Sequence, residues 1–173
     1  PGLFVGWGAK DVTDDLVRIA EYLGAPVATT LQGLGVFPGD HPLHAGFGFG
    51  RSAVPSARNA FKDCDVMLAI GTRFAEICTG SYGSVPPEKL IHIDINADAI
   101  GANYKAAIGI HADARDAVPA LAEALLARGE ARDRSGAELQ IANDKAAYRK
   151  QWHTHDSGDR VNPCRFFEEL RRQ

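Results

Sequence analysis

Short apolar runs alternate along this chain with longer segments in which apolar residues recur every three or four positions. The runs lie at residues 3–5, 27–30, 66–70, 90–95 and 107–110, and they have the length of strands. Residues 66–70 read Val-Met-Leu-Ala-Ile, all apolar and without alternation. A strand of that composition is buried on both faces, as in a parallel sheet covered by helices. The pattern therefore predicts a buried strand at residues 66–70, in the middle of a sheet.

Apolar residues at helical spacing lie between these runs, at residues 16–23, 57–64 and 118–125. We expect Asp11 or Thr13 to cap the first of these helices and Gly24 to end it, and we expect Asp116 to cap the third. Strands that alternate with helices favour βαβ units with right-handed crossovers. The expected fold is a doubly wound α/β domain, in which helices cover both faces of a mostly parallel sheet of about six strands.

A long connection joins the second and third apolar runs. Residues 32–50 are rich in glycine and include Pro38 and Pro42, so we expect a loop here. Loops of this length inside a compact domain commonly wrap a ligand or a partner. The loop is therefore a candidate for part of a binding site.

The chain becomes polar after residue 128. Residues 129–162 include one expected helix, at about 138–152, and we interpret them as a linker toward a neighbouring domain. An amphipathic helix is expected to start at Pro163, and the only methionine is Met67. We therefore expect a piece of a longer protein, with one domain at 1–128, a linker at 129–162 and the start of a truncated following domain at 163–173.

Composition narrows the possible partners. The 173 residues are 24% charged with a net charge of -3. The chain therefore has no excess of positive charge that would indicate binding to nucleic acid or to an anionic membrane. No apolar run approaches the roughly 20 residues that cross a bilayer, and no signal peptide is visible. The three cysteines show no CxxC spacing, so we expect reduced thiols and a cytoplasmic protein.

Polar residues follow the strands expected at 66–70 and 90–95. Gly71, Thr72 and Arg73 come directly after the first, and Asp94 lies near the end of the second. The carboxyl ends of parallel strands share one edge of the sheet, where open α/β folds bind ligands. Arg73 could bind an anion or form an ion pair at the domain edge, and Asp94 and Asp113 could contact a ribose or serve as strand ends and caps.

Several familiar motifs are incomplete. Gly6-Trp7-Gly8 resembles the start of a dinucleotide fingerprint, but Asp11 stands at the third glycine position and would repel a pyrophosphate. Residues 45–52 lack the first glycine and the lysine of a P-loop. The His41/His44 and His153/His155 pairs have no third ligand nearby in sequence. We therefore identify no catalytic residue and no metal ligand.

Longer stretches carry a family resemblance. Residues 30–43 resemble the T-L-x-G-L-G-x-F-P-x-x-H-P-L stretch of acetolactate-synthase-like thiamine diphosphate enzymes. Ala45-Gly46 with the glycines after it, residues 65–74, and residues 92–96 through 100–103 resemble the same family in the same order. The match covers roughly residues 1–128 and corresponds to the central domain of that family. Past Phe74 the sequence departs from acetolactate synthase, and Ile77 stands where an arginine near FAD is expected.

The resemblance implies a Rossmann-like fold of the DHS-like NAD/FAD-binding type. In the family, thiamine diphosphate and Mg²⁺ lie between the two outer domains, so they would bind outside this chain. The parent would be a decarboxylase, lyase or acyl-transferring synthase acting on a 2-keto acid, and this chain alone would be inactive. Some relatives hold FAD or ADP in the central domain. When the family's binding positions are transferred to this sequence, the resemblance implies that the nucleotide contacts come from Gly6, Gly8, Thr30, Leu31, Gln32, Gly46, Gly71, Thr72, Arg73, Asp94, Ile95 and Asp113.

Two other functions remain open at this point. One is a ligand-free assembly domain, and the other is a flavin- or NAD-binding domain of an unrelated family. The resemblance also implies the partners, which are the two flanking domains of the parent and further copies of it in a homo-oligomer. A melting shift with FAD or ADP would separate a binding domain from an assembly domain.

Overall fold

The computed structural model describes residues 1–173 and contains one six-stranded sheet in which every strand pairing is parallel. The strand order is β3-β2-β1-β4-β5-β6, the doubly wound order with its reversal between β1 and β4. The strands are β1 (Gly2–Val5), β2 (Val27–Thr29), β3 (His44–Phe47), β4 (Val66–Ile70), β5 (Lys89–Asp94) and β6 (Ile108–His111). The expected fold class is therefore confirmed.

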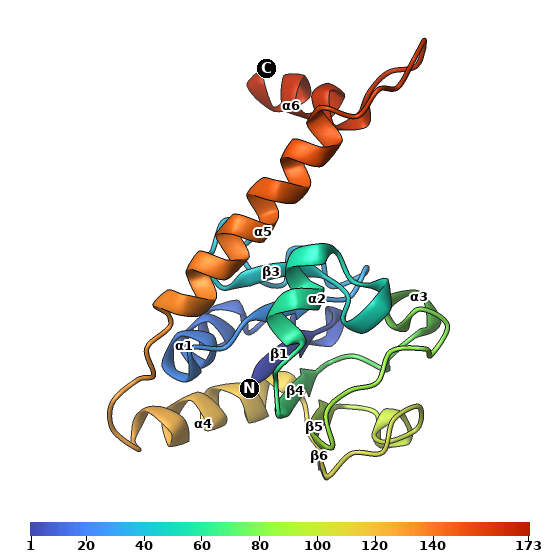
Figure 1. The fold of residues 1–173 in the computed structure, drawn as a ribbon. Helices are drawn as coiled ribbons and strands as arrows, with labels where there is room; N and C mark the ends of the chain where they lie inside the picture. Colours follow the sequence, from blue (N-terminus) through green and yellow to red (C-terminus); the bar gives the residue numbers. More distant parts are fainter.

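Helices cover both faces of this sheet (Figure 1). On one face, α1 (Thr13–Leu23) and α4 (Ala114–Leu126) share a core with alternate strand residues. On the other face, α2 (Pro55–Phe61) and α5 (Ser135–His153) close a second core. In β4, Leu68 and Ile70 belong to the first core, and Met67 and Ala69 belong to the second. The unbroken apolar run therefore follows from burial on both faces.

The edge strand β3 was missed from the sequence. It lies inside the loop expected at 32–50 and pairs with β2, with a register shift between Val27 and Ala28. Its residues His44-Ala45-Gly46-Phe47 contain no β-branched side chain, and Gly46 has φ +115. Low strand propensity hid the strand, and the neighbouring strand β2 provides the pairing that forms it.

Two helix caps differ from expectation. Val12 occupies the N-cap of α1 without a side-chain hydrogen bond, so Asp11 and Thr13 are both wrong as caps. Thr13 Oγ1 instead donates to the carbonyl of Val36, 2.9 Å away, and ties the long loop to the helix. Asp113, not Asp116, caps α4 by accepting from the amide of Arg115. Gly24 ends α1 in the left-handed conformation, as expected.

The remaining elements are α3 (Glu76–Thr79), α6 (Pro163–Arg172) and short 3-10 helices at Trp7–Ala9, Gly50–Ser52 and Ala97–Ala99. α5 covers the helix expected at 138–152, and its Ile141 is buried in the second core. Asn59 donates to Asp144 and holds α5 on α2. The upper end of α5 extends beyond the sheet and carries α6 (Figure 1). No helix is long and apolar enough to cross a bilayer.

Candidate functional site

A cleft of about 690 Å³ lies at the carboxyl ends of the strands, where the chain leaves β1 and β4. These strands are neighbours in the sheet, and the strand order reverses between them. Doubly wound folds bind their ligands at this switch point. The cleft is lined by Trp7, Gly8, Thr30, Gln32, Gly71, Thr72, Arg73, Ala75, Cys78, Asp94, Asn96 and Ala99.

Close backbone contact accounts for the glycines at the floor of this cleft and for Gly6 just behind it. A Cβ on Gly6 would lie 2.2 Å from the carbonyl oxygen of Gly71, and one on Gly8 would lie 2.8 Å from the Gly71 Cα. Gly8 also donates its amide to the Gly71 carbonyl at 3.1 Å. Gly71 itself has φ +59, a conformation that glycine adopts at little cost. The turns after β1 and β4 are thus locked together, and their glycine amides are used within the protein.

Other backbone amides in or beside the cleft are free. The N–H groups of Thr72 and Arg73, just after β4, make no hydrogen bond within the chain, and neither do those of Leu31 and Gln32 after β2. The Arg73 guanidinium is exposed and forms no ion pair. Free amides beside a cation provide donors for an anionic oxygen. The loop after β4 is therefore the part of the cleft suited to a phosphate.

Buried side chains fix that loop. Phe74 has φ +52, which is strained for a residue with a side chain, and its ring is 1% exposed in the second core. Buried His92 lies with its Nε2 2.7 Å from the Thr72 carbonyl oxygen, and Asn103 Nδ2 donates to the Arg73 carbonyl at 2.9 Å. These contacts hold the backbone of residues 72–74 in place before any ligand arrives.

Asp94 lies between the cleft and a smaller cavity of about 220 Å³. Its Oδ1 accepts from the amide of Asn96 at 2.8 Å, which leaves Oδ2 available to a hydroxyl group. The smaller cavity is also lined by Asp11, Ile95, Asp113 and Arg115. The Arg115 side chain and amide hold the Asp113 carboxylate and lower its pKa. Asp113 therefore acts as a helix cap and ion-pair partner here.

Most of the residues expected from the sequence meet at this edge of the sheet. The cleft brings together Gly8, Thr30, Gln32, Gly71, Thr72, Arg73 and Asp94, and the smaller cavity adds Ile95 and Asp113. Three others line neither cavity. Gly6 packs behind Gly71, Leu31 is 45% exposed beside the cleft, and Gly46 lies on the edge strand, where a Cβ would approach Val54.

Sequence reasoning did not include several lining residues, namely Trp7, Ala75, Cys78, Asn96 and Ala99. Trp7 is 58% exposed, with Lys10 Nζ 5.7 Å from its ring centroid, and it gives the cleft an aromatic wall. Its place between two glycines was visible in the sequence. Cys78 and Ala75 reach the cleft only through the turn into α3, which no sequence pattern indicated. Burial raises the pKa of the Cys78 thiol, so the thiol is neutral and a poor nucleophile.

The groups that line the cleft therefore suit an anion with an attached hydroxylated and planar group. The free amides and Arg73 could donate to an anion, Asp94 could accept from hydroxyls, and Trp7 offers a stacking surface. No group of three or more His, Cys, Asp or Glu side chains could hold a metal ion.

Known proteins show similarity to most of this chain. The family model described as "Thiamine pyrophosphate enzyme, central domain" matches residues 1–121. A probable acetolactate synthase large subunit of Methanocaldococcus jannaschii is 42% identical over 130 residues, covering 73% of this chain and 22% of the relative. The acetolactate synthase large subunit of Corynebacterium glutamicum is 40% identical over 126 residues, covering 71% and 20%. The chain spans about a fifth of the length of these relatives.

Proposed function

Because the chain belongs to the thiamine pyrophosphate enzyme family, as its central domain, we propose that it binds an adenine nucleotide within an acetolactate-synthase-like enzyme acting on a 2-keto acid. The observation that carries the nucleotide role is the switch-point cleft, where free amides and Arg73 adjoin the Asp94 carboxylate. The parent would be a decarboxylase, lyase or acyl-transferring synthase. In it, thiamine diphosphate with Mg²⁺ would supply the carbanion chemistry.

The ADP moiety, which ADP and FAD share, is the part that these residues fit. The amides of Thr72 and Arg73 would donate to the diphosphate, and the Asp94 carboxylate would accept from ribose hydroxyls. The Trp7 ring would lie against a planar base. Ile77, which is 61% exposed, offers no charge to a longer ligand such as FAD. These roles are binding and orientation, and the chain contributes no proton transfer.

The partners proposed for this chain are the flanking domains of the parent and other copies in a homo-oligomer. Support comes from α6, which leaves Phe166 and Leu170, both outside the cavities described for this chain, more than half exposed. A helix with that much uncovered apolar surface is suited to packing against further protein. We also propose a cytoplasmic parent, since Cys64, Cys78 and Cys164 are free thiols.

Thermal unfolding with added nucleotide tests the binding role. A ligand at 100 times its Kd adds about 2.7 kcal/mol, which for a domain of this size raises Tm by about 5–10 °C. We expect such a shift with ADP or FAD, and a smaller one for Arg73→Gln at the same ligand concentration. Arg58→Gln on α2, exposed and outside the cleft, is the matched control.

The two ligands also separate the alternatives. A shift with ADP that equals the shift with FAD indicates that the shared ADP moiety provides the binding energy, whereas a shift with FAD alone indicates a flavin site. Unchanged melting with both nucleotides would contradict the proposal and favour a ligand-free assembly domain.

A further inference from the structure

A second recess, the α5–α6 groove, lies where these two helices meet the loop before β3, and its volume is about 600 Å³. It shares no lining residue with the switch-point cleft. The residues from α5 are spaced along one face of that helix, and the residues from α6 extend from its first turn to its last. The lining consists of Gly39, His44, Lys145, Tyr148, Arg149, Trp152, Pro163, Cys164, Phe167 and Arg171.

The charges that line this groove all have the same sign. Lys145, Arg149 and Arg171 are its only charged side chains apart from the titratable His44, and none of them forms an ion pair. Burial and the nearby Arg149 guanidinium both lower the pKa of Lys145, which shows the cost of keeping its charge there. A cluster of cations without a counterion binds an added anion favourably because the anion relieves their repulsion.

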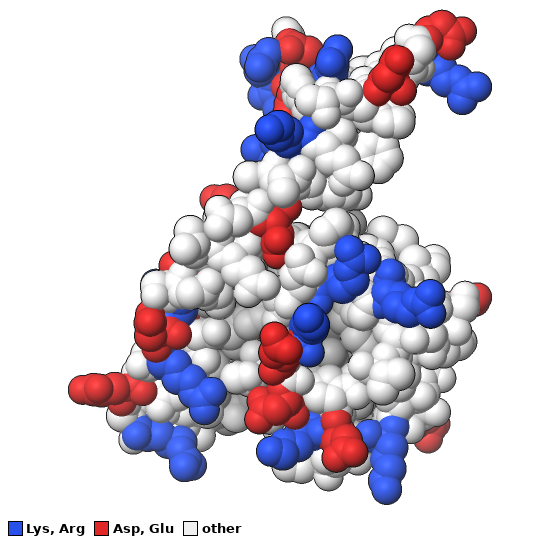
Figure 2. All heavy atoms as spheres, viewed as in Figure 1, with Lys and Arg blue, Asp and Glu red and all other residues white.

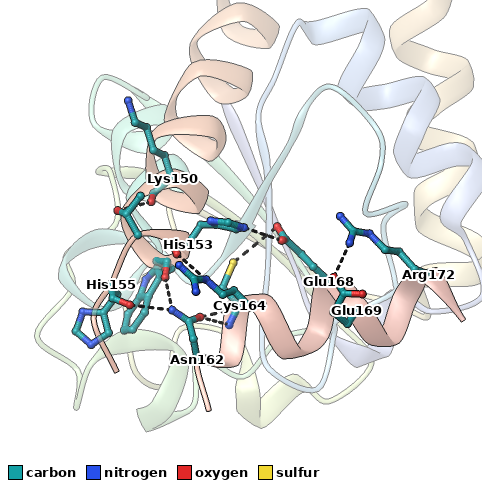
Figure 3. A network of polar contacts seen from close by, with 11 residues as sticks. Lys150, His153, His155, Asn162, Cys164, Glu168, Glu169 and Arg172 are labelled. Atoms are coloured by element: carbon teal, nitrogen blue, oxygen red, sulfur yellow. Dashed lines mark hydrogen bonds and ion pairs between the residues drawn. The ribbon is translucent and has the colours of Figure 1, made fainter. Parts of the chain in front are cut away.

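A carboxylate close to the groove is already engaged elsewhere. Glu168 on α6 lies 3.2 Å from His153 Nε2 and accepts a long contact from Cys164 Sγ (Figure 3). Glu169 pairs with Arg172 on the outside of the same helix. Space-filling atoms show basic and acidic side chains mixed over the end of the molecule that carries α6 (Figure 2). The chain therefore does not neutralise the cations inside the groove itself.

Aromatic side chains form the rest of the walls. Trp152 is 41% exposed and Phe167 is 56% exposed, and Tyr148 meets Trp152 edge to face with ring centroids 6.2 Å apart. His44 adds no charge, because burial and Lys145 lower its pKa. Cations beside open aromatic faces are suited to a ligand with an anionic group and an apolar or planar part.

The angle between the two helices is fixed by Asn162. Its Oδ1 accepts from the amides of Cys164 and Arg165 and caps α6, while its Nδ2 donates to the carbonyls of Trp152 and His155 at the end of α5 (Figure 3). Asn162 is only 8% exposed. Four hydrogen bonds from one side chain hold the groove walls together, so the groove exists without a ligand.

We propose that the α5–α6 groove binds a small organic phosphate, whose phosphate group lies among the three cations and whose organic part lies against the Trp152 ring. The volume lies within the range of small-molecule sites, which favours a metabolite over a macromolecule. Arginine and lysine together provide bidentate and point-charge donors for phosphate oxygens. This site is independent of the nucleotide role proposed for the switch-point cleft.

Tryptophan fluorescence can read the two sites separately, because Trp7 and Trp152 are the only tryptophans. In the 173-residue chain carrying Trp7→Phe, the emission of Trp152 reports on the groove during titration with phenyl phosphate. We expect a saturable change. Lys145→Gln combined with Arg149→Gln should raise the Kd at least about tenfold, since hydrogen bonds to charged groups are lost. Lys150→Gln, one residue further along α5 and outside the groove, should leave the Kd unchanged.

Circular dichroism melts establish that each variant is folded, and exposed Arg149→Gln alone provides a second variant that leaves buried contacts intact. The proposal is overturned if Trp152 emission does not saturate, if the Lys145/Arg149 variant binds as tightly as its parent, or if a glutamate-rich peptide binds the groove more tightly than phenyl phosphate. The same titration with ADP in a Trp152→Phe chain reports on Trp7, so failure at one site is distinguished from failure at the other.

Discussion

At the scale of single residues, the identity of the glycines in the switch-point cleft is decided by the protein's own backbone. The loops after β1 and β4 approach so closely that a Cβ on Gly6, Gly8 or Gly71 would collide with main-chain atoms. A tight turn with close backbone approach therefore accounts for the Gly6-Trp7-Gly8 sequence, which resembles the start of a dinucleotide fingerprint. The donors left for a ligand are the neighbouring amides of Thr72 and Arg73.

Gly8→Ala tests this contact. The added methyl group would lie 2.8 Å from the Gly71 Cα, and main-chain atoms cannot rotate away, so we expect the free energy of unfolding to fall by about 1–3 kcal/mol. Gly39→Ala is the control, because nothing lies within 4 Å of its Cβ position. Urea denaturation of both variants measures the difference. Equal stabilities would show that the two loops are not in contact.

The lowered pKa of His44 should make the stability of the folded chain depend on pH. Burial, followed by the charge of Lys145, lowers its pKa in the folded chain below the ordinary value of 6.5. The unfolded chain therefore takes up the proton first, so the folded state loses stability as the pH falls below about 6.5 and keeps it above.

Urea denaturation between pH 7.5 and pH 5.5 should show this loss, and His44→Gln should have a shallower slope than the parent chain. His155→Gln, which changes an exposed histidine, is the control. A slope that is the same in His44→Gln and in the parent would contradict the role assigned to His44.

At the scale of elements, the strand that the hydrophobic pattern determines was predicted correctly. The strand and the helix cap that depend on tertiary contacts were missed. β4 was identified correctly because burial on both faces requires an apolar residue at every position. β3 was missed because Ala45 and Gly46 have no strand propensity and form a strand only beside β2. The α4 cap was misplaced because Asp113 and Asp116 are equally good caps in sequence.

α5 provides a test of how far the domain extends along the chain. Ile141 is 1% exposed in the second core, so Ile141→Ala should lower the free energy of unfolding by about 2–5 kcal/mol. Leu139→Ala, two residues earlier on the same helix and 64% exposed, should change it by less than about 0.5 kcal/mol. Thermal or urea melts give both values. A small effect of Ile141→Ala would mean that α5 is not packed on the sheet.

At the scale of the whole molecule, β1 and β4 lie between the two hydrophobic cores. The sheet brings most of the expected site residues to the edge at the carboxyl ends of its strands. The candidate site followed from sequence to the extent that its residues lie at or just beyond the ends of strands, as Thr72, Arg73 and Asp94 do. Cys78 and Asn96 could not be foreseen, because their positions depend on how turns fold over that edge. The α5–α6 groove was also invisible, since its cations converge only once α6 turns back at Asn162.

The most direct measurement of the central claim is a titration of the ¹⁵N-labelled chain with ADP, followed through its backbone amide resonances. The account predicts that the amides of Leu31, Gln32, Thr72 and Arg73 shift together and saturate at one Kd, because these free N–H groups lie in or beside the cleft. Spectra in which none of these amides moves, or in which only residues of the α5–α6 groove respond, would contradict it.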